Sequence, residues 1–439
     1  MSAQAAALAR VPEPEALPRL LAGARSDGSA VSLAEHLDRY GDVPLRPRRG
    51  AAAELIELVE AAGLQGRGGA SFPTARKLRA VAETGRGRKA FVLANGVEGE
   101  PLSGKDQVLL RYVPHLVLDG AAAAAAAVGA RKTTVAVGAG ARDAFSAVHN
   151  AIAERERRRH DRVGFQLVCV PDQFVAGEET ALVNWLNGGP AKPTFTPPRP
   201  FERGLRGAPT LVQNVETLAQ LALIARFGPE WFRGLGTPEE PGSALVTLAG
   251  AVHRPGIYEI PLGLSFPDLL ARAGGPSAPI AAFLVGGYFG AWVAAERARS
   301  LALLESDLRT AGASLGARAI VAFPASACGI VETARVTRYL AEESAGQCGP
   351  CVHGLAAIAT ALEQLAWSKA GRRSPDTRLG RWLEQVTGRG ACRHPDGAVR
   401  LVESALRVFR DERERHAQGS CSGAGRPLLP IRERRPVGR

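Results

Sequence analysis

The feature that most constrains the fold is an alternation of short apolar runs and helical patterns between residues 89 and 171. KAFVLANG (89–96), TTVAVGAG (133–140) and FQLVCVP (165–171) are short and apolar, as buried strands are. The residues between them, 106–130 and 143–160, have helical patterns. Strands that alternate with helices predict an α/β fold with a parallel sheet and helices on both faces.

Two further regions follow a long proline-rich loop, GGPAKPTFTPPRPFERG (188–204), whose length is usual for functional or disordered loops. SALVTLAGAVHRPGIYEIP (243–261) predicts a β-hairpin that turns at RPG, and LSFPDLLARAGG predicts a helix after it. From residue 331 onward the pattern is helical, which predicts a small bundle with cysteines in its loops. The expected divisions are an irregular extension with one short helix (1–50), the α/β domain (51–238), a small α+β domain (242–330), the bundle (331–415) and a basic tail (416–439).

The net charge of +12 comes from 55 basic and 43 acidic residues. Arginine-rich runs at 154–162 and 431–439 are interpreted as solvated faces or chain ends. No aromatic-interleaved basic motif or helix-turn-helix pattern is present, so nucleic-acid binding is not expected. An acidic partner protein or nucleotide phosphates would use the charge equally well.

The N-terminal residues lack the pattern of a signal peptide, and the most apolar stretch, LVLDGAAAAAAAVGA (116–130), is interrupted by Asp119 and glycines. We therefore expect a cytoplasmic protein without direct membrane insertion, which reaches a membrane only through partners. Six cysteines are too few for a disulfide scaffold, and their concentration in the C-terminal third favours metal ligation. Cys348 and Cys351 form a C-x-x-C motif, which is half of a tetrahedral metal site.

A glycine-rich loop, GLQGRGGASFPTARKL (63–78), precedes a basic helix start. Gly66, Gly68 and Gly69 allow backbone N–H groups to approach an anionic or planar ligand, and Arg67 and Lys77 supply positive charge. An ordinary turn would also use these glycines, so the loop alone is weak evidence.

Polar side chains occur at three other predicted element ends. Glu98 and Glu100 follow the first strand, where ligands bind in open α/β sheets, although a solvated turn would explain them equally well. Glu178 and Glu179 follow Gly177 at a helix start, where capping alone would account for them. Gln213 and Asn214 offer amides before another helix.

Taken together and in order, GRGGASFPTARK, NGVEGEP, GEETAL, KPTF, QNVETL and ESAGQCGPC with Cys392 resemble the NADH-oxidising flavoprotein subunit of respiratory complex I. That family includes the diaphorase subunits of NAD-linked hydrogenases and formate dehydrogenases. The resemblance covers about residues 50–415. It implies a Rossmann-like FMN-binding domain, a ubiquitin-like SLBB domain and a helical iron–sulfur domain.

The resemblance also implies roles for individual residues and the reaction itself, in which NADH passes a hydride to FMN and single electrons then leave through an iron–sulfur cluster. The implied FMN contacts are Gly66, Arg67, Gly68, Lys77, Asn95, Glu98, Gly177, Glu178, Glu179, Gln213 and Asn214, and the implied NADH contacts are Phe72, Glu100, Lys192 and Phe195. Glu100 and Glu179 are the expected catalytic residues. Cys348, Cys351 and Cys392 are the expected cluster ligands.

The sequence departs from the family pattern at three positions. Val97 replaces an aspartate beside the flavin, and Ala80 replaces an aromatic of the NADH platform. Ala345 replaces the first cluster cysteine, so the chain would hold a 3Fe–4S centre, or a 4Fe–4S cubane with another ligand, unless the cluster is lost. The candidate replacement ligands near in sequence or in the tail are His353, His394, Asp396 and Cys421. Cys169 and Cys328 are expected to be plain core residues.

Three functions agree with this pattern. The leading expectation is an NADH dehydrogenase subunit that delivers electrons to a redox partner protein, such as a small cluster-bearing subunit, a ferredoxin or a membrane reductase. The alternatives are an Rnf-like ferredoxin-linked NAD oxidoreductase subunit, because NGVEGEP is closer to that group, and a degenerate scaffold without catalysis.

Overall fold

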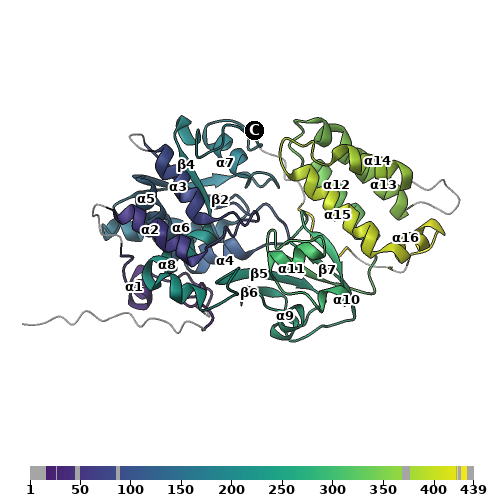
Figure 1. Ribbon diagram of the computed structural model, residues 1–439, viewed down its shortest axis with the longest axis horizontal. Coiled ribbons are helices and arrows are strands. Elements are labelled where there is room, and N and C mark those ends of the chain that lie inside the picture. Colours follow the sequence, from purple (N-terminus) through teal and green to yellow (C-terminus); the bar gives the residue numbers. More distant parts are fainter. Residues whose placement is uncertain are drawn as a thin grey trace, which may run out of the picture.

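The computed structural model describes residues 16–25, 27–44, 50–85, 89–367, 376–421, 423 and 427–432. A parallel sheet with its helices forms one half of the molecule, and a mixed sheet and a helical bundle form the other (Figure 1). The α/β class and the order of the three parts agree with the sequence-based prediction. The exact domain boundaries remain predictions.

The parallel sheet has four strands in the order β3-β2-β1-β4. These are β1 (Phe91–Gly96), β2 (Lys132–Gly138), β3 (Gly164–Val170) and β4 (Thr210–Asn214). The helices of this half are α2 (Ala51–Ala62), α3 (Thr74–Thr84), α4 (Lys105–Tyr112), α5 (Pro114–Val128), α6 (Arg142–Arg157), α7 (Glu179–Leu186) and α8 (Val215–Arg233). The register pairs Asn95 with Asn214, so both residues lie at the carboxyl edge of the sheet.

The helix expected over residues 106–130 is instead two helices, α4 and α5, bent by 98° at Val113. Pro114 begins α5, and a residue before proline is disfavoured in helical conformation. Nearly all of α5 is buried, and at Gly120 an added Cβ would lie 1.8 Å from the carbonyl oxygen of Leu218 on α8. Among the described residues, no single helix is long and apolar enough to cross a membrane.

The short helix expected near residue 35 is α1 (Leu33–Tyr40), which begins with a capping box at Ser32. His36 on its buried face lies 2.6 Å from the carboxylate of Asp119 on α5, and Arg155 and Arg226 also pair with that carboxylate. Arg155 is only 1% exposed. The interpretation of the 154–162 run as a solvated face is therefore wrong at this residue, whose charge is compensated by Asp119 and Asp161.

The second sheet is mixed, with the order β6-β5-β9-β7-β8. Its strands are β5 (Ser243–Gly250), β6 (Gly256–Pro261), β7 (Ile280–Val285), β8 (Ala291–Ala294) and β9 (Ala319–Pro324), and its helices are α9 (Phe266–Arg272), α10 (Ala295–Ala298) and α11 (Glu305–Thr310). The predicted hairpin is formed by β5 and β6, which pair antiparallel. The helix predicted after it is α9.

The C-terminal bundle comprises α12 (Gly329–Glu342), a π-helical turn (Pro350–Gly354), α13 (Leu355–Trp367), α14 (Asp376–Val386), α15 (His394–Val408) and α16 (Arg410–Ala417). Residues 427–432 then return toward the parallel sheet. Tyr288 donates a hydrogen bond to the carbonyl oxygen of Pro430 at 2.5 Å, and the Arg432 guanidinium donates to the carbonyl oxygen of Glu98 at 3.1 Å. The end of the described chain thus contacts the loop that follows β1.

Candidate functional site

The carboxyl edge of the parallel sheet gathers several of the predicted site residues. The Asn95 amide donates to the carbonyl oxygen of Gly177 at 2.8 Å, which joins the end of β1 to the loop before α7. Asn214 caps α8 by accepting from the N–H of Glu216, and its amide donates to Asp106 at 2.7 Å. Because all four strands are parallel, this edge is where an α/β sheet binds ligands.

The glycine-rich loop lies against this edge, just before α3. Gly66 bonds through its N–H to the carbonyl oxygen of Phe72, and an added Cβ at Gly68 would lie 3.1 Å from the Cβ of Asn214. Gly69 has a φ of +108°, which side-chain-bearing residues rarely adopt. No side chain caps the N-terminus of α3. The N–H of Thr74 donates to the carbonyl oxygen of Leu64, but the N–H groups of Ala75 and Arg76 precede the first intrahelical bond and are available to an anion. These features fit the phosphate of FMN.

Lys77 and Glu179 form an ion pair of 2.8 Å that links α3 to α7, with side chains 24% and 27% exposed. Glu178 caps α7 by accepting from the N–H groups of Thr180 and Ala181. Burial raises the pKa of Glu178, although these hydrogen bonds oppose the shift. Gln213 is buried, and its amide donates to the Thr74 hydroxyl at the start of α3.

Arg67 does not face the ligand edge. Its side chain is 1% exposed and donates to the carbonyl oxygens of Pro241 and Ser243, while its N–H donates to Thr217. These contacts join the glycine loop to the mixed sheet and leave the guanidinium unavailable to a phosphate. Arg67 therefore positions the loop instead of supplying the expected charge.

The two carboxylates after β1 are both turned inward. Glu98 accepts from the Ser103 hydroxyl and from the N–H groups of Asp106 and Gln107 at the start of α4. Burial, and then the charge of Asp106, raise the pKa of Glu98 to about 7. Glu100 is 9% exposed and accepts from the N–H groups of Tyr288 at 2.7 Å and Leu102 at 3.1 Å. The Glu100 carboxylate thus points into the interface with the mixed sheet, away from the position that the expected contact with a nucleotide requires.

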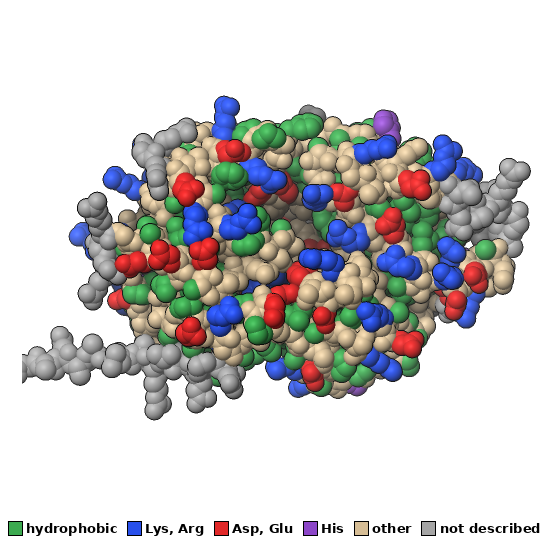
Figure 2. Space-filling view, viewed as in Figure 1, with side chains coloured by type: hydrophobic (Ala, Val, Ile, Leu, Met, Phe, Trp, Pro, Cys, Tyr) green, Lys and Arg blue, Asp and Glu red, His purple; other side chains and the backbone are tan. Residues whose placement is uncertain are grey.

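Two aromatic side chains remain open to solvent near this edge. Phe72 is 48% exposed and Phe195 is 80% exposed, and the Arg76 guanidinium lies 5.6 Å from the Phe72 ring centroid. Figure 2 shows a hollow in the middle of this face, between the parallel-sheet half and the C-terminal half. Val97 donates its N–H to Asn95, and its carbonyl oxygen would lie 2.5 Å from a Cβ at Gly177, so the loops around it are tightly packed.

The three expected cluster cysteines come together in the helical bundle. Cys351 lies on the π-helical turn and Cys348 just before it, and the N–H of Cys351 donates to the carbonyl oxygen of Cys348 at 3.0 Å. Burial, followed by the charge of Cys348, raises the pKa of Cys351 to about 12, and Cys392 contributes to the same shift. Burial raises the pKa of Cys392, and the charges of Glu178 and Cys348 add to that shift. Cys392 thus lies near both Cys348 and Glu178.

The position of the missing fourth cysteine, Ala345, is 4% exposed, and its carbonyl oxygen accepts from Lys192. Of the candidate replacement ligands, Asp396 is engaged elsewhere, because it accepts from the N–H of Gly388. His394 bonds through Nε2 to the carbonyl oxygen of Leu340 at 2.7 Å, and its buried Nδ1 has no hydrogen-bond partner. His353 is exposed on the π-helical turn itself.

Two expectations about cysteines are wrong. Cys421 does not fold back to the cluster cysteines, because it lies beside Cys328 at the opposite end of α12. Cys169 is exposed on β3 and is not a core residue. The contact of Arg432 with the loop after β1 is not among the predicted features, because the sequence holds no local signal for it.

Comparisons with known proteins agree with this arrangement. Family models match as the Nuo51 FMN-binding domain over residues 59–223, the SLBB domain over 245–287, and the NADH-ubiquinone oxidoreductase-F iron-sulfur binding region over 332–416. The second NADH-quinone oxidoreductase F subunit of Rhizobium meliloti is 33% identical over 83% of this chain and 89% of its own length. The corresponding F subunit of Mycobacterium bovis is also 33% identical, over 83% of this chain and 85% of its own length.

Two solved structures of an NAD+-reducing NiFe hydrogenase are similar to this chain. The H2-reduced form has a TM-score of 0.76 and 32% identity over 84% of this chain, and the air-oxidised form has a TM-score of 0.79 and 31% identity over 89%. This chain spans 63% of the length of the first hydrogenase chain. With its FMN-binding, SLBB and iron–sulfur-binding regions in this order, the chain belongs to the family of NADH-quinone oxidoreductase F subunits.

Proposed function

We propose that this protein oxidises NADH at an FMN held on the carboxyl edge of the parallel sheet and passes the electrons to an iron–sulfur cluster in the bundle. The observation that carries the proposal is the adjacency of the two sites. Lys192, in the loop after α7, donates to the carbonyl oxygen of Ala345 at 2.7 Å, and the N–H of Phe174, before α7, donates to the carboxylate of Glu343 at the end of α12 at 3.0 Å. A short distance between flavin and cluster is what single-electron transfer needs.

The chain's residues hold and orient the two nucleotides. The glycine loop and the uncapped start of α3 receive the FMN phosphate, and the Lys77–Glu179 pair lies beside them. Phe72 and Phe195 present open aromatic faces, which suit stacking against the nicotinamide nucleotide. When bound, FMN accepts a hydride from NADH and releases electrons singly, which no side chain can do. Glu100 is a positioning residue that does not reach this surface. Its carboxylate accepts from the N–H of Tyr288 and so connects the loop after β1 to the mixed-sheet half.

Cys348, Cys351 and Cys392 are the proposed cluster ligands. All three come from the region that matches the family's iron–sulfur model. Among the described candidates to replace the cysteine missing at Ala345, Asp396 is engaged by the N–H of Gly388, whereas His394 keeps a buried Nδ1 without a hydrogen-bond partner. We infer a cluster with three thiolates, either 3Fe–4S or a 4Fe–4S cubane with one iron open to a small ligand.

The proposed electron acceptor is a partner protein that docks near the cluster. The relatives are named as subunits of oxidoreductases, and Val352, next to Cys351, is 51% exposed. A small cluster-bearing subunit, a ferredoxin or a membrane reductase would each fit such a site. The Rnf-like alternative is favoured by one observation, Val97 in NGVEGEP, and reduced ferredoxin would then reduce the flavin as readily as NADH does.

The test is an anaerobic visible spectrum of the purified full-length protein, reconstituted with FMN, before and after one equivalent of NADH. Bleaching of the flavin band is expected, with residual broad absorbance from the cluster. Gly68→Val should abolish FMN binding, because even the first added carbon, the Cβ, would lie 3.1 Å from the Cβ of Asn214. Gly164→Val is the matched control, since an added Cβ there meets nothing within 4 Å. A wild-type protein that never binds FMN would instead support the non-catalytic scaffold.

A further inference from the structure

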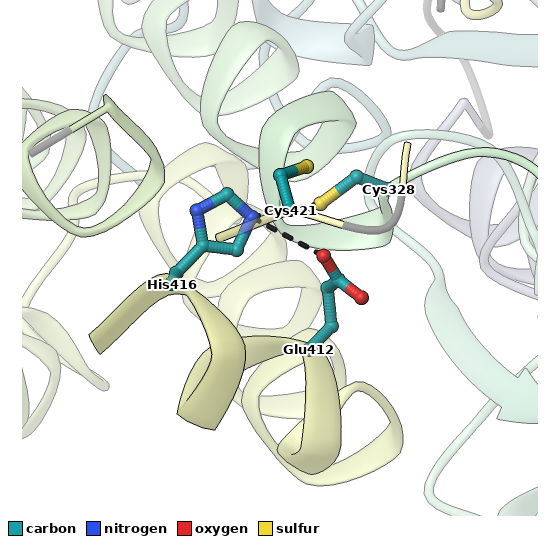
Figure 3. Close-up of side chains that lie close together, drawn as sticks. All are labelled: Cys328, Glu412, His416 and Cys421. Atoms are coloured by element: carbon teal, nitrogen blue, oxygen red, sulfur yellow. Dashed lines mark hydrogen bonds and ion pairs between the residues drawn. The ribbon is translucent and has the colours of Figure 1, made fainter. Parts of the chain in front are cut away.

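A second set of metal-ligand side chains lies away from the proposed cluster. Cys328 immediately precedes α12, Glu412 and His416 are on α16, and Cys421 follows α16. One ligand atom from each of the four lies within 4.8 Å of all the others. Figure 3 shows the four side chains directed toward a common centre.

The individual distances are those of a mononuclear site. The Cys328 sulfur lies 3.1 Å from Nε2 of His416, and the same nitrogen lies 3.5 Å from a carboxylate oxygen of Glu412. Ligand atoms bound tetrahedrally to one zinc ion at about 2.0–2.3 Å are roughly 3.3–3.8 Å apart. Glu412 and His416 are four residues apart on one helix, which places them on the same face.

The surroundings also favour a bound cation. Cys328, Glu412 and His416 are buried, so two anionic ligands and an imidazole would share a poorly hydrated space. Cys421 is exposed, which leaves an entry path for the ion.

We propose that Cys328, Glu412, His416 and Cys421 form a structural zinc site that is separate from the iron–sulfur cluster. Two sulfur ligands, one nitrogen and one oxygen fill the four positions of tetrahedral zinc, without an open position for catalysis. The site and the cluster cysteines lie beyond opposite ends of α12, whose 14 residues span about 21 Å at 1.5 Å per residue.

The zinc ion would fix the start of the tail that returns to the flavin region. Gly423 packs so closely on the backbone N–H of Cys328 that an added Cβ would lie 2.5 Å away. Farther along, Leu429 donates its N–H to Glu332 on α12 at 2.8 Å, and Arg432 reaches the carbonyl oxygen of Glu98. The metal would thus fix the chain at Cys421, and residues 427–432 beyond it support the loop after β1.

The test measures zinc and iron together, by elemental mass spectrometry, in full-length protein equilibrated with Zn2+ and then desalted. Wild type is expected to retain about one zinc per chain. Cys421→Ser and His416→Ala should each lower zinc affinity by at least about tenfold. Cys169→Ser is the matched control for an exposed thiol and should keep its zinc. Cys392→Ala should lose iron but not zinc, which separates the failure of this site from a failure of the cluster.

Two results would overturn the site. The first is a wild type that retains no zinc, or one whose zinc content is unchanged in both Cys421→Ser and His416→Ala. The second is a Cys328–Cys421 disulfide in protein alkylated under anaerobic conditions, because the sulfurs would then be unavailable as ligands. Removal of zinc by a chelator should also accelerate proteolytic loss of the tail in wild type. An unchanged rate would exclude a role of the metal in holding residues 427–432 in place.

Discussion

The ammonium group of Lys192 donates a hydrogen bond to the carbonyl oxygen of Ala345 at 2.7 Å. Lys192 lies in the proline-rich loop that carries Phe195, and Ala345 occupies the position of the missing cluster cysteine. The contact therefore joins the proposed nucleotide surface directly to the cluster loop. It also gives Lys192 a different partner from the nucleotide that the family resemblance implies.

This contact predicts the effect of removing the ammonium group. Lys192→Met should lower the iron content per chain, because the cluster loop loses a charge-assisted hydrogen bond of about 1.5–3 kcal/mol. The KM for NADH should change little. Iron is measured by elemental mass spectrometry, with exposed Lys89→Met as the control. Full iron content combined with a raised KM would return Lys192 to a nucleotide-binding role.

The open face of Phe72 predicts a defect confined to NADH. Phe72→Ala should raise the KM for NADH roughly fivefold, the equivalent of about 1 kcal/mol of lost stacking. FMN content should be unchanged, because the glycine loop is intact. Steady-state kinetics with an artificial acceptor test this, and Trp367→Ala, at a residue 54% exposed on α13, is the control. Identical kinetics in Phe72→Ala and wild type would exclude the stacking role.

The departure at residue 345 predicts a gain of metal. Ala345→Cys restores the fourth thiolate at a buried position three residues before Cys348, so iron per chain should rise and the cluster should survive air exposure longer. Ser344→Cys, which adds a thiol one residue earlier, is the control and should not raise the iron content. If both variants match wild type, the cluster does not reach this position.

The inward-facing Glu100 predicts a pH dependence of stability. Burial raises the pKa of Glu100 to about 7, above the ordinary value of 4.5, so the folded protein binds a proton more readily than the unfolded chain does. The stability that this group contributes is present below about pH 4.5 and is lost as the pH rises to about 7, at up to about 1.4 kcal/mol per pH unit. In Glu100→Gln this part of the pH slope should vanish.

Thermal unfolding at pH 5.5 and pH 8 measures that slope. The melting temperature of wild type relative to Glu100→Gln should be higher at pH 5.5 than at pH 8. Exposed Glu239→Gln should follow wild type at both pH values. A pH-independent difference between Glu100→Gln and wild type would mean that Glu100 stays charged throughout.

The buried Asp119 predicts a large loss of stability. Asp119→Ala leaves His36, Arg155 and Arg226 without their shared carboxylate, and removal of one partner from such a buried network costs about 3–5 kcal/mol. Asp143→Ala removes a carboxylate that is 70% exposed and should cost less than about 1 kcal/mol. Denaturant unfolding monitored by circular dichroism compares the two variants, and equal losses would contradict the network's importance.

The parallel sheet was predictable because its first three strands are short apolar runs. β1 and β2 are buried along most of their length, whereas β3 is an edge strand that keeps the apolar pattern although most of it is exposed or half-buried. β4 was not predicted as a strand, since only Leu211 and Val212 mark it before the amides of Gln213 and Asn214. The break between α4 and α5 did have a signal, Pro114, but the long alanine run after it outweighed that signal in the prediction of one helix.

The site was predictable where chain topology alone decides position. Parallel strands bring Asn95 and Asn214 to one edge, whatever the side chains elsewhere do. The orientations of Arg67 and Glu100 depend instead on Ser243 and Tyr288, which belong to the other sheet. The approach of Cys328 to Cys421 likewise depends on how α12 and α16 pack, and local sequence carries no information about that packing.

The bond between Arg432 and Glu98 has a consequence for the order of folding. Domains usually fold as they leave the ribosome, N-terminal first, so the parallel sheet can form while most of the bundle is still being synthesised. The loop after β1 nevertheless gains its last support only when residue 432 has emerged. Nascent chains shorter than this are expected to have a complete sheet but an unfinished flavin pocket, so that loading of the cofactor becomes a late, post-translational event.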